Sequence, residues 1–304
     1  MLQSTYFNED FGKKIFKTTI IKKKIPKKRV NGMELKTDFP KTRSSLAKDF
    51  RNLGLKKGMT VIVHSSLKSL GWVVGGPVAV VQALMDVLTE EGTLVMPAHT
   101  AHYSDPAGWL NPPVPEEWWP VIRDEMPAFD PEVTPTFFMG AVVEAFRTFP
   151  GVIRSNHPTE SFAAWGKNKE IIINGQTLDF ALGEDSPLGK MYELGGHVLL
   201  IGVGYDSNTT MHLAEHRVPN PKTEENAGPY YLDGQRVWKT FTQVSYREEL
   251  FEEIGNAYEE AGHTVKKGKA GLAECRLIPQ VELVNFTERW LANYEKTLKP
   301  ATNA

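Results

Sequence analysis

Apolar residues along this chain follow two spacings, one typical of helices and one typical of buried strands. Between residues 77 and 88 the apolar positions recur every three or four residues, which predicts an amphipathic helix. Short apolar runs at 60–63 and 92–96 flank this segment and predict strands. The order strand, helix, strand is typical of an α/β fold.

The same pattern predicts further elements on both sides of this unit. A short helix is expected from Ser44, with serine as its cap and Gly54 at its end. Asp233-Gly234 between two apolar runs predicts a β-hairpin. The other expected elements are a helix at 141–148, a strand at 161–165, a helix from Ser186-Pro187 to Gly195-Gly196, a strand at 197–203, and helices near 247–261 and 279–294.

The segment 97–138 interrupts this order. It is rich in proline, contains Trp109, Trp118 and Trp119, and carries seven acids against one arginine, Arg123. Long loops inside compact domains are usually functional lids or disordered, and the aromatic residues favour a lid. Acids beside exposed indoles suit a cationic ligand, although the tryptophans could instead attach the loop to the body of the protein.

Composition indicates a globular protein of 304 residues with 41% hydrophobic and 10% aromatic residues. No window approaches the roughly 18 consecutive apolar residues of a membrane helix. Residues 1–32 carry a net charge of +7 and residues 33–304 a net charge of −9. We expect a basic, disordered extension over 1–32 without a secretory signal, and a single domain over 33–304, with neither a membrane nor a nucleic-acid partner.

A single cysteine, Cys275, excludes an internal disulfide and indicates a reducing compartment, so we expect the protein in the cytoplasm. Its neighbours Glu274 and Arg276 have opposing effects on the thiol. We therefore interpret Cys275 as structural.

Two stretches carry the most chemical information. His64-Ser-Ser-Leu-Lys-Ser-Leu-Gly71 ends a strand and leads through Gly75-Gly76 into a helix opened by Pro77, an arrangement that directs backbone N–H groups at an anion. Arg154-Ser-Asn-His-Pro158 places His157 before a proline, in extended backbone. The first stretch predicts a phosphate site and the second a histidine base.

Together these stretches resemble the aminoglycoside N3-acetyltransferase family, also described as antibiotic N-acetyltransferases. Three further blocks match in the same order, Gly183-Glu-Asp-Ser-Pro-Leu-Gly-Lys190, Val198-Leu-Leu-Ile-Gly202 and Thr210-Met-His-Leu-Ala-Glu-His-Arg217. The resemblance extends from about Asp38 to the last helix. It implies a single-domain antibiotic N-acetyltransferase-like α/β fold with a central mixed sheet flanked by helices, distinct from the common N-acetyltransferase superfamily.

The resemblance also implies acetyl transfer from acetyl-CoA to an amine, the 3-amino group of a 2-deoxystreptamine aminoglycoside. We expect direct attack with His157 as general base, Glu184 beside the imidazole and a donor to the oxyanion near Thr210. Thr210 could equally be a helix cap. Whether the protein is a monomer or a homodimer stays open.

The expected binding residues fall into two groups. For acetyl-CoA they are His64, Ser65, Ser66, Leu67, Lys68, Gly75 and Gly76, with Lys68 as a partner for phosphate and His64 as a structural residue at the strand end. For the amine they are Asp185, His212 and Glu215, although Asp185 could instead stabilise a helix N-terminus or exchange roles with Glu184.

Two alternatives remain at this stage. His212-Leu-Ala-Glu215-His216 matches the His-x-x-Glu-His pattern of inverted zinc proteases, but the helix ends near Pro219 and the sequence indicates no third ligand. The family resemblance explains the same residues without a metal. The chain could also bind coenzyme A without transferring acetyl groups to antibiotics, either with another amine acceptor or without turnover.

Overall fold

The computed structural model describes residues 29–30, 33–34 and 39–298. The chain divides into two units, Met1–Lys36 and Thr37–Ala304. In the first unit, β1 (Arg29–Val30) pairs with β2 (Met33–Glu34) in antiparallel orientation. Most of the predicted extension over 1–32 lies outside the described residues, so its disorder stays a prediction.

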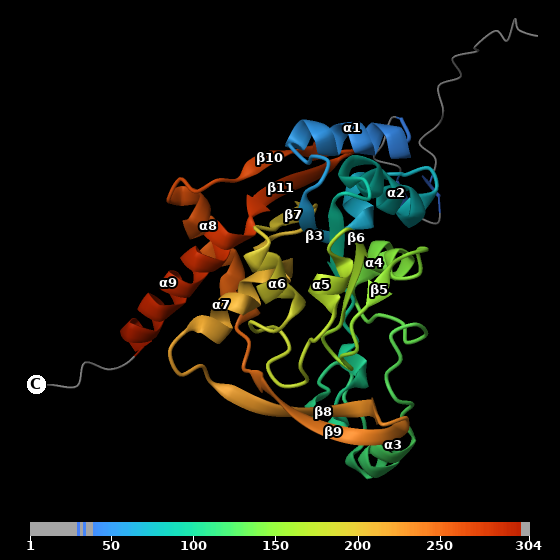
Figure 1. The fold of residues 1–304 in the computed structure, drawn as a ribbon, viewed down its shortest axis with the longest axis vertical. Coiled ribbons are helices and arrows are strands. Elements are labelled where there is room, and N and C mark those ends of the chain that lie inside the picture. Colours follow the sequence, from blue (N-terminus) through green and yellow to red (C-terminus); the bar gives the residue numbers. More distant parts are fainter. Residues whose placement is uncertain (1–28, 31–32, 35–38, 299–304) are drawn as a thin grey trace, which may run out of the picture. The chain divides into compact units, whose positions relative to one another are not determined.

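The second unit is built on a seven-stranded mixed sheet with the strand order β10-β11-β7-β3-β4-β6-β5 (Figure 1). The strands are β3 (Thr60–Ser65), β4 (Thr93–Pro97), β5 (Ile153–Arg154), β6 (Phe162–Gly166), β7 (His197–Ile201), β10 (Lys266–Ala270) and β11 (Ala273–Pro279). β3 is parallel to both β4 and β7, while β11 and β6 run antiparallel to their neighbours. The carboxyl ends of β3, β4 and β7 therefore meet at one edge.

Helices cover both faces of this sheet. They are α1 (Arg43–Leu53), α2 (Gly76–Leu88), α4 (Gly140–Phe146), α5 (Lys169–Ile173), α6 (Pro187–Glu193), α7 (His212–Arg217), α8 (Phe251–Glu260) and α9 (Gln280–Leu298). Successive strand residues point to opposite faces, so Val61 and Val63 pack with α1, α2 and α4, whereas Ile62 packs with α5 to α9. Figure 1 shows α1 and α2 on one side of the sheet and α6 to α9 on the other.

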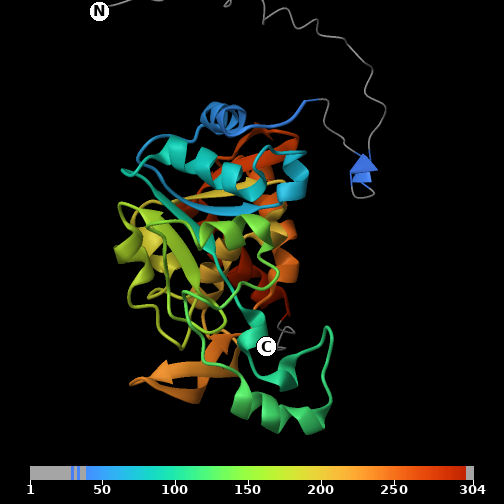
Figure 2. The same cartoon turned by 90° about the vertical axis from the view of Figure 1, so that its right-hand side faces the viewer.

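A long hairpin projects beyond the sheet. β8 (Thr223–Leu232) and β9 (Gln235–Val244) pair along their whole length around Asp233-Gly234, both with positive φ, as the sequence predicted. The segment 97–138 lies against this hairpin, where Arg236 Nε donates to the carbonyl of Met126 at 2.7 Å. Figure 2 shows α3 (Trp119–Glu125) beside the hairpin.

Short 3-10 helices occupy the connections. They are Leu67–Leu70, Ala101–Tyr103, Pro106–Gly108, Glu116–Trp118, Tyr205–Ser207, Thr209–Met211 and Glu248–Leu250. The first two follow the carboxyl ends of β3 and β4, and those at 205–207 and 209–211 follow β7. They bring polar side chains to the edge where the three parallel strands end.

The predicted fold class is confirmed, with local corrections. The cap of α1 is Thr42, whose hydroxyl accepts from Ser45 N at 3.1 Å, rather than a serine. The pattern missed α3, α5, β5, β10 and β11. A search of the described residues finds no helix long and apolar enough to cross a membrane.

Candidate functional site

A cavity of about 780 Å³ opens where the parallel strands end. Its walls come from segments following β3, β4 and β7, together with Phe138 to Val143 and residues of the hairpin. In open α/β sheets, ligands bind outside the carboxyl ends of the strands, where neighbouring connections leave in opposite directions. The strand order therefore accounts for the position of the cavity.

The segment 64–68 lines this cavity, as predicted for the cofactor. Ser65 ends β3, and its buried hydroxyl has no hydrogen-bond partner among the described residues. Lys68 is the one lysine or arginine among the residues that line the cavity, all of which the structure describes. Gly75 and Gly76 have φ values of 81° and 56° at the start of α2 and do not line the cavity.

His212 forms a close pair with a buried carboxylate in the wall of the cavity. Its Nδ1 lies 2.6 Å from Oε2 of Glu215, which is 1% exposed and also accepts from the backbone N–H of Arg247 at 2.7 Å. The carboxylate fixes the proton on Nδ1, because an ionised carboxylate only accepts hydrogen bonds. Nε2 has no partner within the described residues, so its lone pair is free.

His157 has the opposite arrangement, which does not agree with the predicted base. It is completely buried, and its Nδ1 accepts from the backbone N–H groups of Glu160 at 2.9 Å and Thr159 at 3.2 Å. Nε2 must then carry the proton, which it donates to the carbonyl of Leu178 at 3.1 Å. Burial lowers the pKa of His157 to about 4. Neither nitrogen is available to a substrate in this arrangement, and the ring instead fixes the turn at 157–160.

Glu184 does not lie beside a catalytic imidazole. Its two carboxylate oxygens accept from Nε and Nη2 of Arg217 at 2.6 and 2.9 Å, and this pairing lowers its pKa. Asp185 is exposed, next to Ser186, the N-cap of α6. Neither acid lines the cavity at His212.

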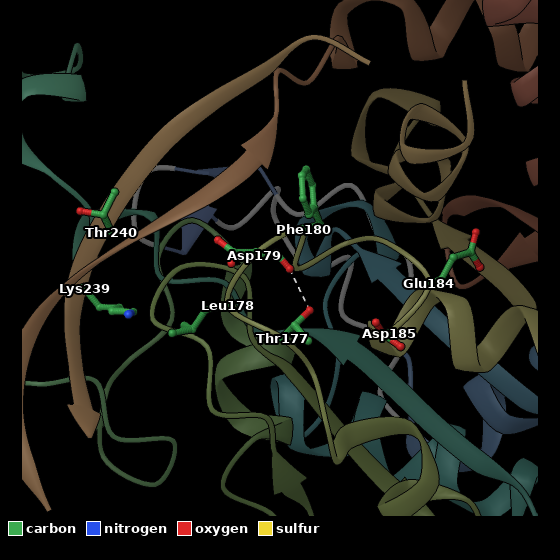
Figure 3. Close-up of a pocket in the computed structure, with 8 residues that line it drawn as sticks. All are labelled: Thr177, Leu178, Asp179, Phe180, Glu184, Asp185, Lys239 and Thr240. Carbon is green, nitrogen blue, oxygen red and sulfur yellow. Dashed lines mark hydrogen bonds between the residues drawn. The ribbon is translucent and has the colours of Figure 1, made fainter. Parts of the chain in front are cut away.

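Both acids instead border a separate surface cavity of about 590 Å³. Figure 3 shows them on one side of it, with Lys239 and Thr240 of β9 on the other and Thr177 to Phe180 between them. The Asp179 carboxylate accepts from the backbone N–H of Thr242 at 2.7 Å, which attaches this segment to the hairpin.

Thr210 lies two residues before His212, in the 3-10 helix Thr209–Met211. Its hydroxyl and the amide nitrogen of Asn208 are buried without hydrogen-bond partners in the described part of the chain. Thr209, rather than Thr210, is among the residues that line the cavity.

Sequence reasoning missed three residues of the cavity wall, Glu160, His99 and Tyr246. Glu160 is 9% exposed, and its Oε2 accepts from the hydroxyl of Tyr246 at 3.3 Å. Burial raises its pKa to about 7, and the nearby charge of His212 opposes this shift. Position 160 follows the His-Pro pair directly, but nothing in its composition distinguishes a buried glutamate from a surface one.

The acids of the 97–138 segment do not face the cavity, although the segment contributes Pro97, His99, Ala101, Ser104 and Phe138 to its wall. Asp105 forms an ion pair with Arg123, and Trp109 Nε1 donates to Ser104 Oγ at 3.0 Å. These contacts fit the alternative in which a tryptophan fixes the loop. The acids that line the cavity are Glu160, Asp206 and Glu248.

The remaining candidates carry no reactive group at the cavity. Cys275 is buried in β11, and burial raises the pKa of its thiol to about 11. Nδ1 of His212 is committed to Glu215, and the structure, as far as it is described, contains no group of three His, Cys, Asp or Glu side chains that could hold a metal ion. The donor arrangement of the zinc alternative is therefore lacking here.

A histidine–carboxylate pair beside a cavity at the carboxyl ends of parallel strands defines an α/β enzyme equipped for proton transfer. Comparison with known proteins assigns its family. Residues 62–292 match the family model of the aminoglycoside 3-N-acetyltransferases, and the chain belongs to this family of acyltransferases.

Individual relatives agree with this assignment. An aminoglycoside N(3')-acetyltransferase-like protein, YokD of Bacillus subtilis (strain 168), is 55% identical over 84% of this chain and 94% of its own length. Its crystal structure matches with a TM-score of 0.84 over 88% of this chain and 97% of that one. Aminoglycoside N(3)-acetyltransferase VII of Streptomyces paromomycinus is 34% identical over 84% and 93% of the two chains. A structure described as AAC-IIIb binary with CoASH matches at 30% identity, with a TM-score of 0.74 over 83% of this chain and 97% of that one.

Proposed function

We propose that the protein transfers an acetyl group from acetyl-CoA directly to an amine, the 3-amino group of a 2-deoxystreptamine aminoglycoside, with His212 as general base. The observation that carries this proposal is the 2.6 Å pair between His212 and Glu215 in the cavity wall. His212 thus takes the role that the sequence had suggested for His157, and Glu215 the role suggested for Glu184.

The proton transfer follows from the state of the imidazole. Nε2 of His212 removes a proton from the attacking amine as its nitrogen bonds to the thioester carbon, and Glu215 stabilises the imidazolium. The carbon–sulfur bond then breaks, coenzyme A leaves as a thiolate, and the proton passes from His212 to sulfur or water. No covalent enzyme intermediate is required, in agreement with the buried, protonated thiol of Cys275.

The oxyanion of the tetrahedral intermediate requires hydrogen-bond donors. Thr210 stays our candidate, because its buried hydroxyl has no partner among the described residues. The hydroxyl of Ser65 is a second donor of the same kind, and it belongs to a residue that lines the cavity.

The charges of the cavity wall suit two ligands of opposite sign. Lys68 and the segment 64–68 fit the phosphates of coenzyme A, and the AAC-IIIb structure described with CoASH supports a cofactor site in this fold. Glu160, Asp206 and Glu248 fit a cationic amine. Gly75, Gly76 and Asp185 lie outside the cavity wall and are not part of this proposal.

The test is thiol release from acetyl-CoA with a panel of 2-deoxystreptamine aminoglycosides. His212→Asn should lower kcat by about 10² to 10⁴ and remove the acidic limb of the pH profile. His263→Asn is a matched control, because His263 forms a similar pair with Glu282 at 2.8 Å on another part of the protein.

A His212→Asn enzyme that turns over within about threefold of the parent would reject His212 as base, since a general base contributes far more than that. Calorimetry separates the remaining alternative. Tight binding of acetyl-CoA by the parent protein, with no thiol release on any amine, would support a homologue that binds the cofactor without transferring acetyl groups.

A further inference from the structure

Glu160 is a buried carboxylate without a cationic partner in the protein. Other partly buried acids pair with arginine, Glu144 with Arg147, Glu184 with Arg217 and Asp105 with Arg123. Within the described residues, the one side-chain donor to Glu160 is the hydroxyl of Tyr246, at 3.3 Å. Burying an unpaired charge is costly, so a charged Glu160 is stabilised by a cation that enters the cavity.

The groups around Glu160 do not supply this cation. His157 donates no proton to it, because Nδ1 of His157 accepts the backbone N–H of Glu160. His64 and His99 also line the cavity and are neutral at pH 7, since burial and the nearby charge of His212 lower the pKa of each to about 3. His212 must itself be neutral to accept a proton as a base.

The backbone fixes Glu160 in the cavity wall. Its N–H donates to His157, and its carbonyl accepts from Nε2 of Gln176 at 2.8 Å. The same Gln176 nitrogen donates to the carbonyl of Ala181 at 2.9 Å, which joins two segments of the wall. A carboxylate held in this way is pre-organised for recognition.

We propose that Glu160, held by Tyr246, binds a second ammonium group of the acceptor while His212 deprotonates the first. The inference rests on the proposed acetyl transfer and narrows its acceptor to a diamine. A cyclitol with two amino groups on one ring has this chemistry. A monoamine of the same ring size leaves Glu160 without its cation.

The experiment compares two cyclitols, 2-deoxystreptamine with two amino groups and scyllo-inosamine with one. Glu160→Gln keeps the size of the side chain and a hydrogen-bond acceptor but removes the charge. We expect it to weaken 2-deoxystreptamine about tenfold or more, in both KM and the Kd from calorimetry, while the values for scyllo-inosamine stay within about twofold. Glu91→Gln, which removes the same charge at the exposed Lys57 pair, should change neither.

Tyr246→Phe provides an independent variant if Glu160→Gln is poorly folded. It removes the hydroxyl that orients Glu160 and keeps the carboxylate, so we expect a smaller loss confined to the diamine. A further readout is the Kd of 2-deoxystreptamine, which should tighten in the parent protein as the pH rises through about 7 and should not do so in Glu160→Gln.

Equal effects on the diamine and the monoamine, or no effect on either, would overturn the second-ammonium site. Failure of the proposed function gives a different result, because binding is measured separately from turnover. Selective loss of diamine binding in Glu160→Gln without thiol release in any protein would support the site and reject acetyl transfer. Thiol release from an enzyme insensitive to Glu160→Gln would do the reverse.

Discussion

Two histidines show how local hydrogen bonds decide which imidazole can act as a base. His157 and His212 both occur in motifs that resemble the family, and each has one nitrogen held by the protein. Nδ1 of His157 accepts backbone N–H groups, so its lone pair is used. Nδ1 of His212 faces a carboxylate, so its proton is fixed and the lone pair of Nε2 remains.

The buried state of His157 leads to a stability prediction. Its pKa is about 4 in the folded protein and about 6.5 when unfolded, so the unfolded chain binds more protons between these values. The stability from His157 is therefore present above about pH 6.5 and is lost as the pH falls toward 4. Between pH 7 and about pH 5, the parent should lose about 1 to 2 kcal/mol more unfolding free energy than His157→Asn.

Urea unfolding at the two pH values measures this difference. At pH 7 the variant should itself be less stable by about 1 to 3 kcal/mol, because the carbonyl of Leu178 loses its buried donor. His263→Asn is the control and should keep the pH dependence of the parent. An unchanged slope in His157→Asn would mean that this histidine is not buried in its neutral form.

At the scale of secondary-structure elements, the hairpin β8–β9 supports the long 97–138 segment. Arg236 of β9 donates to the carbonyls of Met126 and Arg123, which follow and belong to α3. Since 97–138 contributes five residues to the cavity wall, its attachment bears on the acceptor site. We expect Arg236→Gln to raise the KM of the acceptor severalfold, with the KM of acetyl-CoA little changed.

Limited proteolysis provides the structural readout for this variant. Cleavage within 97–138 should become faster, because the segment loses two hydrogen bonds to the hairpin. Lys239→Gln is the matched control, since Lys239 lies on the same strand, is exposed and makes no contact with α3 that the structure records. Equal proteolysis of the two variants would show that Arg236 does not hold the segment.

The elements also show what the sequence could predict. Apolar periodicity was sufficient for β3, α2 and β4, and Asp233-Gly234 for the hairpin, because these depend on neighbouring residues. β10 was missed because Lys266, Lys267 and Lys269 make it polar, as is common for an edge strand. α3 was missed because Pro120, which is compatible with the first turn of a helix, suggested a loop.

At the scale of the whole second unit, the site depends on contacts between distant segments. Glu160 follows the His-Pro turn, His212 opens α7, and Tyr246 follows the hairpin, yet all three line one cavity. The motifs predicted the segment 64–68 and included His212 and Glu215 among the substrate residues. The pairing of Glu184 with Arg217 instead of an imidazole depends on a contact across 33 positions, which no local pattern contains.

The charge of the whole chain adds a last prediction, about salt. Residues 33–304 carry a net charge of −9, and three acids line the cavity against one lysine. A polycationic aminoglycoside should be attracted over distances that salt screens, since the Debye length falls from about 10 Å at 0.1 M to about 3 Å at 1 M. Its KM should rise severalfold over this range, while kcat changes little and the KM of anionic acetyl-CoA does not rise in parallel. Steady-state kinetics in sodium chloride measures this, with scyllo-inosamine, which carries a single charge, as the weakly affected control. A parallel rise for aminoglycoside and acetyl-CoA would indicate a general salt effect on the enzyme, and would remove electrostatic attraction as the reason for the acidic wall.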